Sequence, residues 1–242
     1  MTFNILFPMS PGFKMDLPLQ SSLLLGIIPA LIIMYIGLKG YEGNYKDKII
    51  FLTFIIGIVL GFFAAVVRSF TLPLMVVYVV LIAIFEQLLK TMILNIRRLQ
   101  QKKEATIYGL SLGLGFGAVF TPFLIVAAGS YVKSDVYVFS LITIGSLGII
   151  LFHGATGAYI GYGIYAGKLT KYLLTAVIIQ LPFNLIIDMA RFYSDTYFSI
   201  LQFGLVIYGL IFFFYVVKKI MPRILVESKL RKRSKKIGTN IK

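Results

Sequence analysis

Cysteine and tryptophan are missing from the sequence, and histidine occurs only once, as His153. Without cysteine the chain can form neither disulfide bonds nor thiolate metal sites. One imidazole cannot supply the several histidine ligands that zinc sites commonly use, so we expect no metal and no other cofactor. Acidic residues are also scarce, since nine Asp and Glu stand against 24 Lys and Arg.

Hydrophobic residues, by contrast, are in excess. They make up 59% of the chain, and the mean hydropathy is +0.91, whereas about 45–50% apolar residues is usual for a soluble domain. The composition therefore predicts an all-α, polytopic membrane protein. A net charge of +15 is also typical of nucleic-acid binders, but here the basic residues lie in loops and in the tail, where they set topology. We expect the lipid bilayer, and no nucleic acid, as a partner.

Seven hydrophobic segments are long enough to cross a bilayer at a rise of about 1.5 Å per residue. Pro29 and Pro122 lie inside two of them and predict bends. The pattern predicts one transmembrane domain over residues 1–222, followed by a basic tail over residues 223–242. The expected spans are residues 17–38, 49–67, 72–94, 105–129, 136–158, 172–189 and 197–217.

Lysine and arginine predict the orientation of these spans. With seven spans, 19 of these residues fall on the side that holds the tail, and four fall on the other side: Lys14, Arg68, Lys133 and Arg191. Because basic loops stay in the cytoplasm, we expect an external N-terminus and a cytoplasmic C-terminus in a multi-pass protein of the cell membrane. The basic tail would then lie against anionic lipid head groups.

Small residues recur at intervals of four along several predicted spans. Residues four apart share one face of a helix, and in a bilayer a face of small residues lets a second backbone approach closely. We therefore expect these faces to lie at helix contacts. They comprise Gly57, Gly61 and Ala65; Gly109, Gly113 and Gly117; and Gly157 and Gly161.

The third span carries Glu86, the only acidic side chain that is predicted to lie deep in the membrane. Gln87 is next to it, and Lys90 follows four residues later on the same face. An ionised group in a spanning helix costs about 2.5–3.5 kcal/mol or more, so Glu86 is expected to face the protein and to act in its function. The alternative is a satisfied Glu86–Lys90 ion pair that only fixes packing.

The fifth and sixth predicted spans contribute further polar side chains. His153 lies about as far along its span as Glu86 does, and both spans enter from outside, so we expect both residues at similar depth in the cytoplasmic half. Gln180, Asn184 and Asp188 are spaced four apart and form a polar stripe on one side of the sixth span. These groups are expected to converge on one buried polar cavity.

Four short motifs occur in order between about residues 75 and 190. They are Glu86-Gln87-Leu88-Leu89-Lys90, the glycine-rich run from Tyr108 to Gly117, His153 with Thr156 and Gly157, and the pair Gln180 and Asn184. In order and spacing these motifs resemble the PrsW and CAAX-protease (CPBP) superfamily of intramembrane proteins. That group includes the YhfC-type proteases and the anterior-pharynx-defective subunit of γ-secretase.

The resemblance implies roles for these residues. In the proteolytic branches, paired glutamates and histidines are thought to activate a water molecule that attacks a peptide bond. If these roles are carried over to this chain, Glu86 would be the base and His153 the electrophile. The supporting residues would be Gln87, Lys90, Gln180 and Asn184.

The chain also departs from the family pattern. Gln87 stands in place of a second glutamate, Phe120 in place of a third, and Gln180 in place of a late histidine. The Gln beside Glu86, the seven spans and the run from Gly113 to Gly117 look closest to the γ-secretase subunit, which is a non-catalytic scaffold.

Three functions therefore stay open, and so does the question whether the protein is an enzyme. The first is a degenerate protease homologue or scaffold that binds a helix of a membrane protein. The second is an active intramembrane endopeptidase that uses Glu86 and His153. The third is a small transporter or channel. In the last case Glu86, Lys90 and His153 would line a proton or solute path. The absence of paired inverted halves in the sequence weighs against a transporter.

Overall fold

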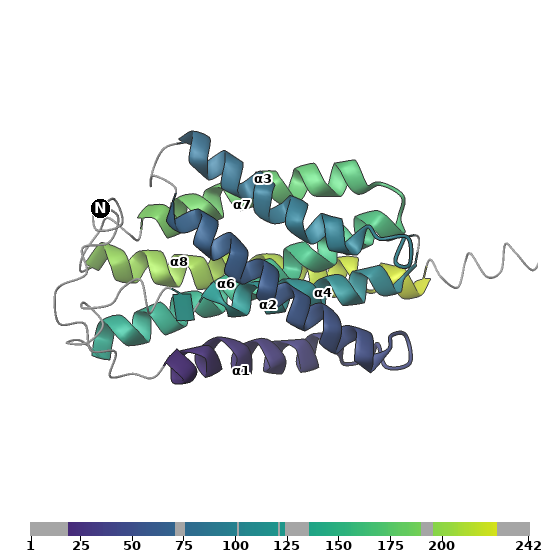
Figure 1. The fold of residues 1–242 in the computed structure, drawn as a ribbon, viewed down its shortest axis with the longest axis horizontal. Helices are drawn as coiled ribbons and strands as arrows, with labels where there is room; N and C mark the ends of the chain where they lie inside the picture. Colours follow the sequence, from purple (N-terminus) through teal and green to yellow (C-terminus); the bar gives the residue numbers. More distant parts are fainter. Residues whose placement is uncertain are drawn as a thin grey trace, which may run out of the picture.

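The computed structural model describes residues 19–70, 76–100, 102–120, 122–123, 136–189 and 196–226. Every regular element in these ranges is helical, which confirms the all-α prediction. Long helices lie side by side along the long axis of the molecule and alternate in direction (Figure 1). They are α1 (Leu19–Leu38), α2 (Asp47–Ser69), α3 (Val76–Leu94), α4 (Glu104–Ala118), α6 (Val136–Tyr165), α7 (Leu169–Met189) and α8 (Thr196–Tyr215), which continues into a π-helical turn, η1 (Val216–Ile220).

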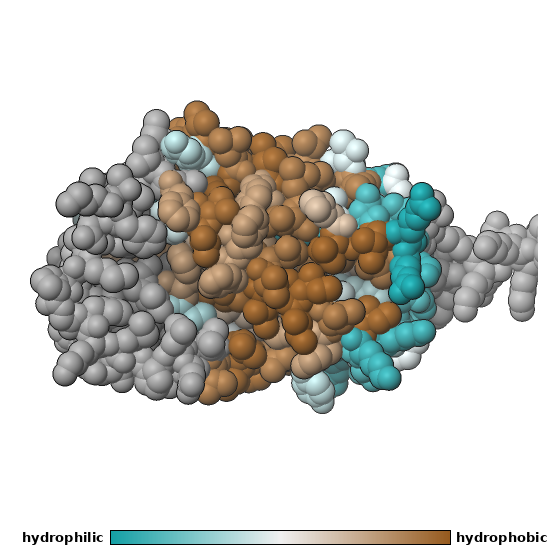
Figure 2. Space-filling model, in the orientation of Figure 1, coloured by the Kyte–Doolittle hydropathy of each residue, from teal (hydrophilic) through white to brown (hydrophobic). Residues whose placement is uncertain are grey.

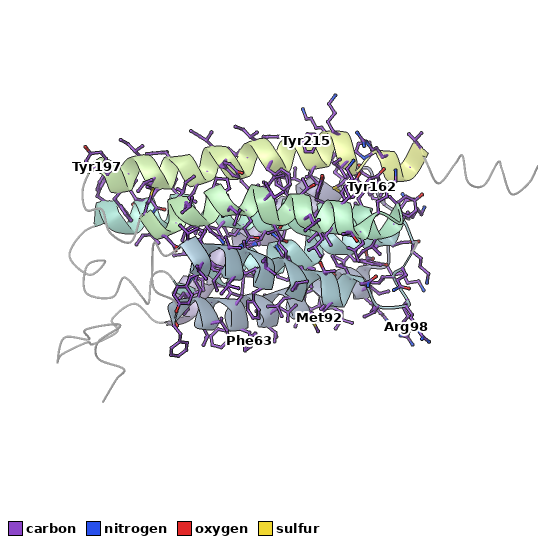
Figure 3. The ribbon with its side chains drawn as sticks, turned by 90° about the horizontal axis from the view of Figure 1, so that it is seen from above. Phe63, Met92, Arg98, Tyr162, Tyr197 and Tyr215 are labelled. Carbon is purple, nitrogen blue, oxygen red and sulfur yellow. The ribbon has the colours of Figure 1, made fainter. Side chains whose placement is uncertain are left out.

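Among the described residues, five helices are long and apolar enough to cross a membrane, namely α2, α3, α6, α7 and α8 with its extension. The apolar part of α1, Leu24–Leu38, is shorter. Large hydrophobic side chains such as Phe63 and Met92 are exposed and point away from the bundle (Figure 3). Figure 2 shows a broad hydrophobic belt across the middle of the molecule. A belt of this kind suits the hydrocarbon of a bilayer, so the chain is a membrane protein.

Hydrophilic side chains gather at one end of the belt (Figure 2). The loops that join α1 to α2, α3 to α4 and α6 to α7 all lie at this end (Figure 1). The first two loops are tied together, because Lys103 Nζ donates to Asn44 Oδ1 at 2.6 Å and the Lys46 N–H donates to the Tyr108 hydroxyl at 3.1 Å. We call this the basic end of the bundle, after exposed residues such as Arg98.

Helix α4 forms the centre of the bundle, and every residue from Ala105 to Ala118 is buried. It packs against α2 on one side and α6 on the other, and glycine allows backbone contact at both. A Cβ added at Gly57 would overlap the carbonyl oxygen of Leu112, and one added at Gly113 would overlap that of His153. The predicted close contacts of the glycine faces of α2, α4 and α6 are therefore confirmed.

The fourth predicted span, residues 105–129, is not one continuous helix. Helix α4 ends at Ala118 with Val119 as its C-cap, and Phe120, Pro122 and Phe123 are helical again. Pro122 explains the break, because its ring has no N–H to donate to the carbonyl four residues earlier and clashes with that carbonyl. At about 1.5 Å per residue α4 is too short to cross about 30 Å of hydrocarbon alone. Residues 124–129 lie outside the described part of the chain.

Helix α6 runs to Tyr165 instead of ending at residue 158 as predicted. It closes with a Schellman turn, in which the Lys168 N–H donates to the Gly163 carbonyl at 2.9 Å and the Gly167 N–H to that of Ile164 at 3.2 Å. Gly167 has a φ of 70°, which glycine adopts without strain. The long α6 therefore ends at the basic end of the bundle.

The other bounds differ from prediction by a few residues. Helix α2 ends at Ser69 and so includes Arg68, which was predicted to lie in a turn outside the membrane. This prediction is wrong, because Arg68 is only 3% exposed and is buried among other helices. Helix α7 starts at Leu169 instead of residue 172. Residues 17–18, 72–75 and 227–242, predicted to be span starts and tail, lie outside the described residues.

Candidate functional site

Glu86, on α3, is the centre of a buried polar cluster and is 0% exposed. Gln180 on α7 donates its amide N–H to the Oε2 atom of Glu86. The Arg68 guanidinium at the end of α2 lies 3.5 Å from Oε1. Nε2 of His153 on α6 is 3.9 Å from Oε2, which is too far for a direct hydrogen bond. The carboxylate therefore lies where α2, α3, α6 and α7 meet.

Gln87 joins the cluster through Gln180. Its Nε2 donates to Gln180 Oε1, while Gln180 Nε2 donates to Glu86, so the two glutamines and the carboxylate form a chain of hydrogen bonds. All three side chains are fully buried. Within the described residues, Oε1 of Gln87 and Oε1 of Glu86 accept no hydrogen bond. These hydrogen bonds link α3 to α7 at two successive residues of α3, Glu86 and Gln87.

Lys90 lies one turn further along α3 and is also fully buried. The ion pair with Glu86, which was the alternative prediction, does not form. Instead Nζ of Lys90 donates to Thr156 Oγ1 at 2.7 Å and lies 3.2 Å from Nδ1 of His153, both on α6. Nζ also lies 5.1 Å from the centre of the Phe116 ring, within the range of a cation–π contact. Lys90 therefore ties α3 to α6.

This contact orients the histidine. A charged ammonium can only donate a hydrogen bond, so with Lys90 charged the Nδ1 atom of His153 is the acceptor. The imidazole proton then resides on Nε2, the atom that faces the Glu86 carboxylate. The N–H dipole of His153 thus points toward the negative charge of Glu86.

Phenylalanine rings enclose the imidazole of His153. The Phe116 centroid lies 4.8 Å from it, and Phe152 meets it edge-on at 5.7 Å. Phe120 stacks on it at 5.3 Å with an interplanar angle of 21°. The resemblance places a carboxylate at the position of Phe120. Here an apolar ring covers the histidine instead.

Sequence analysis missed Arg68 as a site residue. Its Nη1 donates to Asn184 Oδ1 at 3.1 Å, and its Nη2 donates to Asp188 Oδ1 at 3.0 Å, both on α7. The polar stripe that Gln180, Asn184 and Asp188 form on α7 therefore faces the cluster. The sequence carried only a general signal, since an acidic residue on a membrane helix commonly pairs with a basic one and Arg68 is a basic residue at the end of another apolar segment.

The formal charges in the cluster balance, with Arg68 and Lys90 against Glu86 and Asp188. A buried charge without a partner costs several kcal/mol, and the balance avoids that cost. A group of three or more His, Cys, Asp or Glu residues placed to hold a metal is not found among the described residues. The arrangement can thus lock helices together, and it can hold a carboxylate beside an imidazole.

The chain matches no model of a known protein family, no curated protein and no solved structure. The resemblance to the PrsW and CPBP superfamily therefore depends on the four sequence motifs alone.

Proposed function

We propose that this membrane protein is a scaffold of the PrsW and CPBP type, which has lost peptide hydrolysis and binds a helix of another membrane protein. The observation that carries this proposal is the stacking of Phe120 on His153 at 5.3 Å. The resemblance implies that the catalytic branches hold a further carboxylate at this position, beside the histidine. An apolar ring in that place can neither bind nor activate water.

The contacts of Glu86 and His153 support the same proposal. The two side chains are 0% and 2% exposed. Protein groups already occupy most of their polar atoms, since Gln180 and Arg68 bind the carboxylate and Lys90 lies against Nδ1. A general base needs a lone pair within about 2.6–3.2 Å of the proton that it removes. Here these lone pairs hold α2, α3, α6 and α7 together.

The proposed topology has seven spans, with an external N-terminus and a cytoplasmic C-terminus in the cell membrane. Three observations support it: the alternation of helix direction, the five long apolar helices and the gathering of polar loops at one end. In this orientation the basic end and the tail face the cytoplasm and lie near anionic lipid head groups. A partner helix would then bind within the bilayer, against the hydrophobic belt.

The second candidate is an active intramembrane endopeptidase, with Glu86 as base and His153 as electrophile. One observation favours it. Oε1 of Glu86 is buried and accepts no hydrogen bond within the described residues, although it lies 3.5 Å from Arg68. Buried acceptors of this kind commonly bind an ordered water. A water bound at Oε1 would lie within reach of the Glu86 carboxylate, which would act as the base.

Cleavage of a membrane helix separates the two candidates. Purified protein is reconstituted in vesicles of phosphatidylethanolamine and phosphatidylglycerol with a set of fluorogenic transmembrane-helix peptides. For a scaffold we expect no cleavage above the level of empty vesicles, and the same level for Glu86→Gln and His153→Ala. Cleavage by the wild type that disappears in both variants would establish the peptidase. Cleavage that persists undiminished in both variants would remove these residues from the mechanism.

The binding half of the proposal needs its own measurement. A membrane protein that co-purifies in a fixed ratio with the wild type should dissociate more readily from Glu86→Gln, because the change loosens the cluster that holds the helices. The matched control is Glu42→Gln, which alters an exposed glutamate in the loop between α1 and α2. Equal retention of the partner by both variants would contradict a role of the cluster in binding.

A further inference from the structure

Arg68 connects three helices through one planar group. It projects from the last turn of α2, which ends at Ser69. Nη1 lies 3.5 Å from Glu86 on α3 and 3.1 Å from Asn184 on α7, and Nη2 lies 3.0 Å from Asp188, one turn further along α7. Arg68 is 3% exposed, so these contacts are shielded from solvent.

The chemistry of these contacts requires a guanidinium. The group is a rigid fork, and its two terminal nitrogens can bind separate acceptors on one face of a helix. Residues 184 and 188 lie on one face of α7 because they are four apart. A lysine ammonium at position 68 would keep the charge, but as a single point it cannot bind Asn184 and Asp188 and also remain near Glu86.

We propose that Arg68 is the positioning residue of the site, and that its guanidinium fixes the Glu86 carboxylate by clamping α2 and α3 to Asn184 and Asp188 of α7. Arg68 and Asp188 come from the last turns of α2 and α7, at the end of the bundle opposite the basic end (Figure 1), and Glu86 lies in the middle of α3. The proposal concerns the same cluster as the proposed function, and it holds for a scaffold and for a peptidase alike. Neither outcome of the cleavage assay therefore bears on it.

The test measures the spacing of α3 and α7 with spin labels. The chain has no cysteine, so cysteines introduced at Val77 and Met189 are the only labelling sites. Both side chains are exposed. Val77 lies in the first turn of α3, and Met189 is the last residue of α7, next to Asp188. Pulsed electron–electron double resonance on the spin-labelled protein in vesicles gives the distance distribution between the two nitroxides.

The decisive variant is Arg68→Lys, which retains the positive charge. We expect its distance distribution to be broader, or its mean to shift by more than the width of the wild-type distribution. Failure of Arg68→Lys to fold would also support the clamp, provided that Arg223→Lys folds, because Arg223 is exposed and both variants retain the charge. A wild-type distance distribution in Arg68→Lys would overturn the proposal. Arg68 would then only balance the charges of Glu86 and Asp188.

A second variant removes one positive and one negative charge together. Arg68→Met combined with Asp188→Asn leaves Lys90 against Glu86, so the formal charges of the cluster still balance. If Arg68 positions the helices, the distance distribution of the folded double variant also broadens. If Arg68 only balances charge, the double variant gives the wild-type distribution, and the proposal is wrong.

Discussion

The contact between α4 and α6 at Gly113 positions the backbone of His153, and a larger residue at Gly113 tests this. A Cβ at this position would lie 2.7 Å from the carbonyl carbon of His153 and 2.9 Å from the Cα of Gly154. Non-bonded carbon atoms normally lie about 3.5–4.0 Å apart. The opposing atoms belong to the backbone and cannot rotate away, so the helices would have to separate by about 1 Å.

We expect Gly113→Leu to lower the free energy of unfolding by about 1–3 kcal/mol, as overpacked cores do. Separation of α4 and α6 would also move His153 away from Lys90, which reaches it from α3 at 3.2 Å. The measurement is unfolding by sodium dodecyl sulfate in mixed micelles, followed by circular dichroism. The free energy of unfolding is then compared with that of the wild type.

Gly204 on α8 provides the matched control, because a Cβ there would meet no atom within 4 Å. Replacement of glycine by leucine raises helix propensity by a similar amount in both variants, so the difference in their free energies of unfolding isolates packing. Gly204→Leu should retain or slightly exceed wild-type stability. If Gly113→Leu and Gly204→Leu have the same free energy of unfolding, the backbone contact at Gly113 does not stabilise the bundle.

Two further predictions concern the turn after α6 and the topology. Gly167→Ala should lower stability by about 1 kcal/mol, because alanine is strained at a φ of 70°; an unchanged melting temperature would mean that the Schellman turn contributes nothing. Arg98 and Tyr197 lie at opposite ends of the molecule (Figure 3). An impermeant thiol reagent should label Tyr197→Cys in intact cells and Arg98→Cys only after permeabilisation. Labelling of both in intact cells would refute seven spans.

The helices could be predicted because their signals are local. Membrane helices are long apolar segments, and glycine every fourth residue marks a face where backbones meet. That Gly113 lies at a helix contact follows from this pattern, but its partner, the backbone of His153, is known only from the structure. The early end of α4 could also have been read from Pro122, because proline prevents the hydrogen bond to the carbonyl of Ala118.

The partners of the charged side chains could not be predicted in the same way. Spacing of four favours a Glu86–Lys90 pair, yet Lys90 binds Thr156 and lies against His153 on α6. The choice depends on which helices lie next to α3, and that is a property of the tertiary structure. Arg68 was missed for a related reason, since a basic residue at the end of an apolar segment usually marks the membrane boundary. Only the position of α7 shows that it faces inward.

The central claim is that the Glu86 cluster holds the helices together and is not a reaction centre. The most direct test is the free energy of unfolding of Glu86→Gln, measured alongside that of Glu42→Gln, whose side chain is exposed. Removal of one member of a buried ion pair costs about 3–5 kcal/mol, and Arg68 retains Asp188, so we predict a loss of about 3 kcal/mol for Glu86→Gln and almost none for the control. Catalytic groups are commonly maintained at the expense of stability. Unchanged or increased stability of Glu86→Gln would therefore contradict the claim.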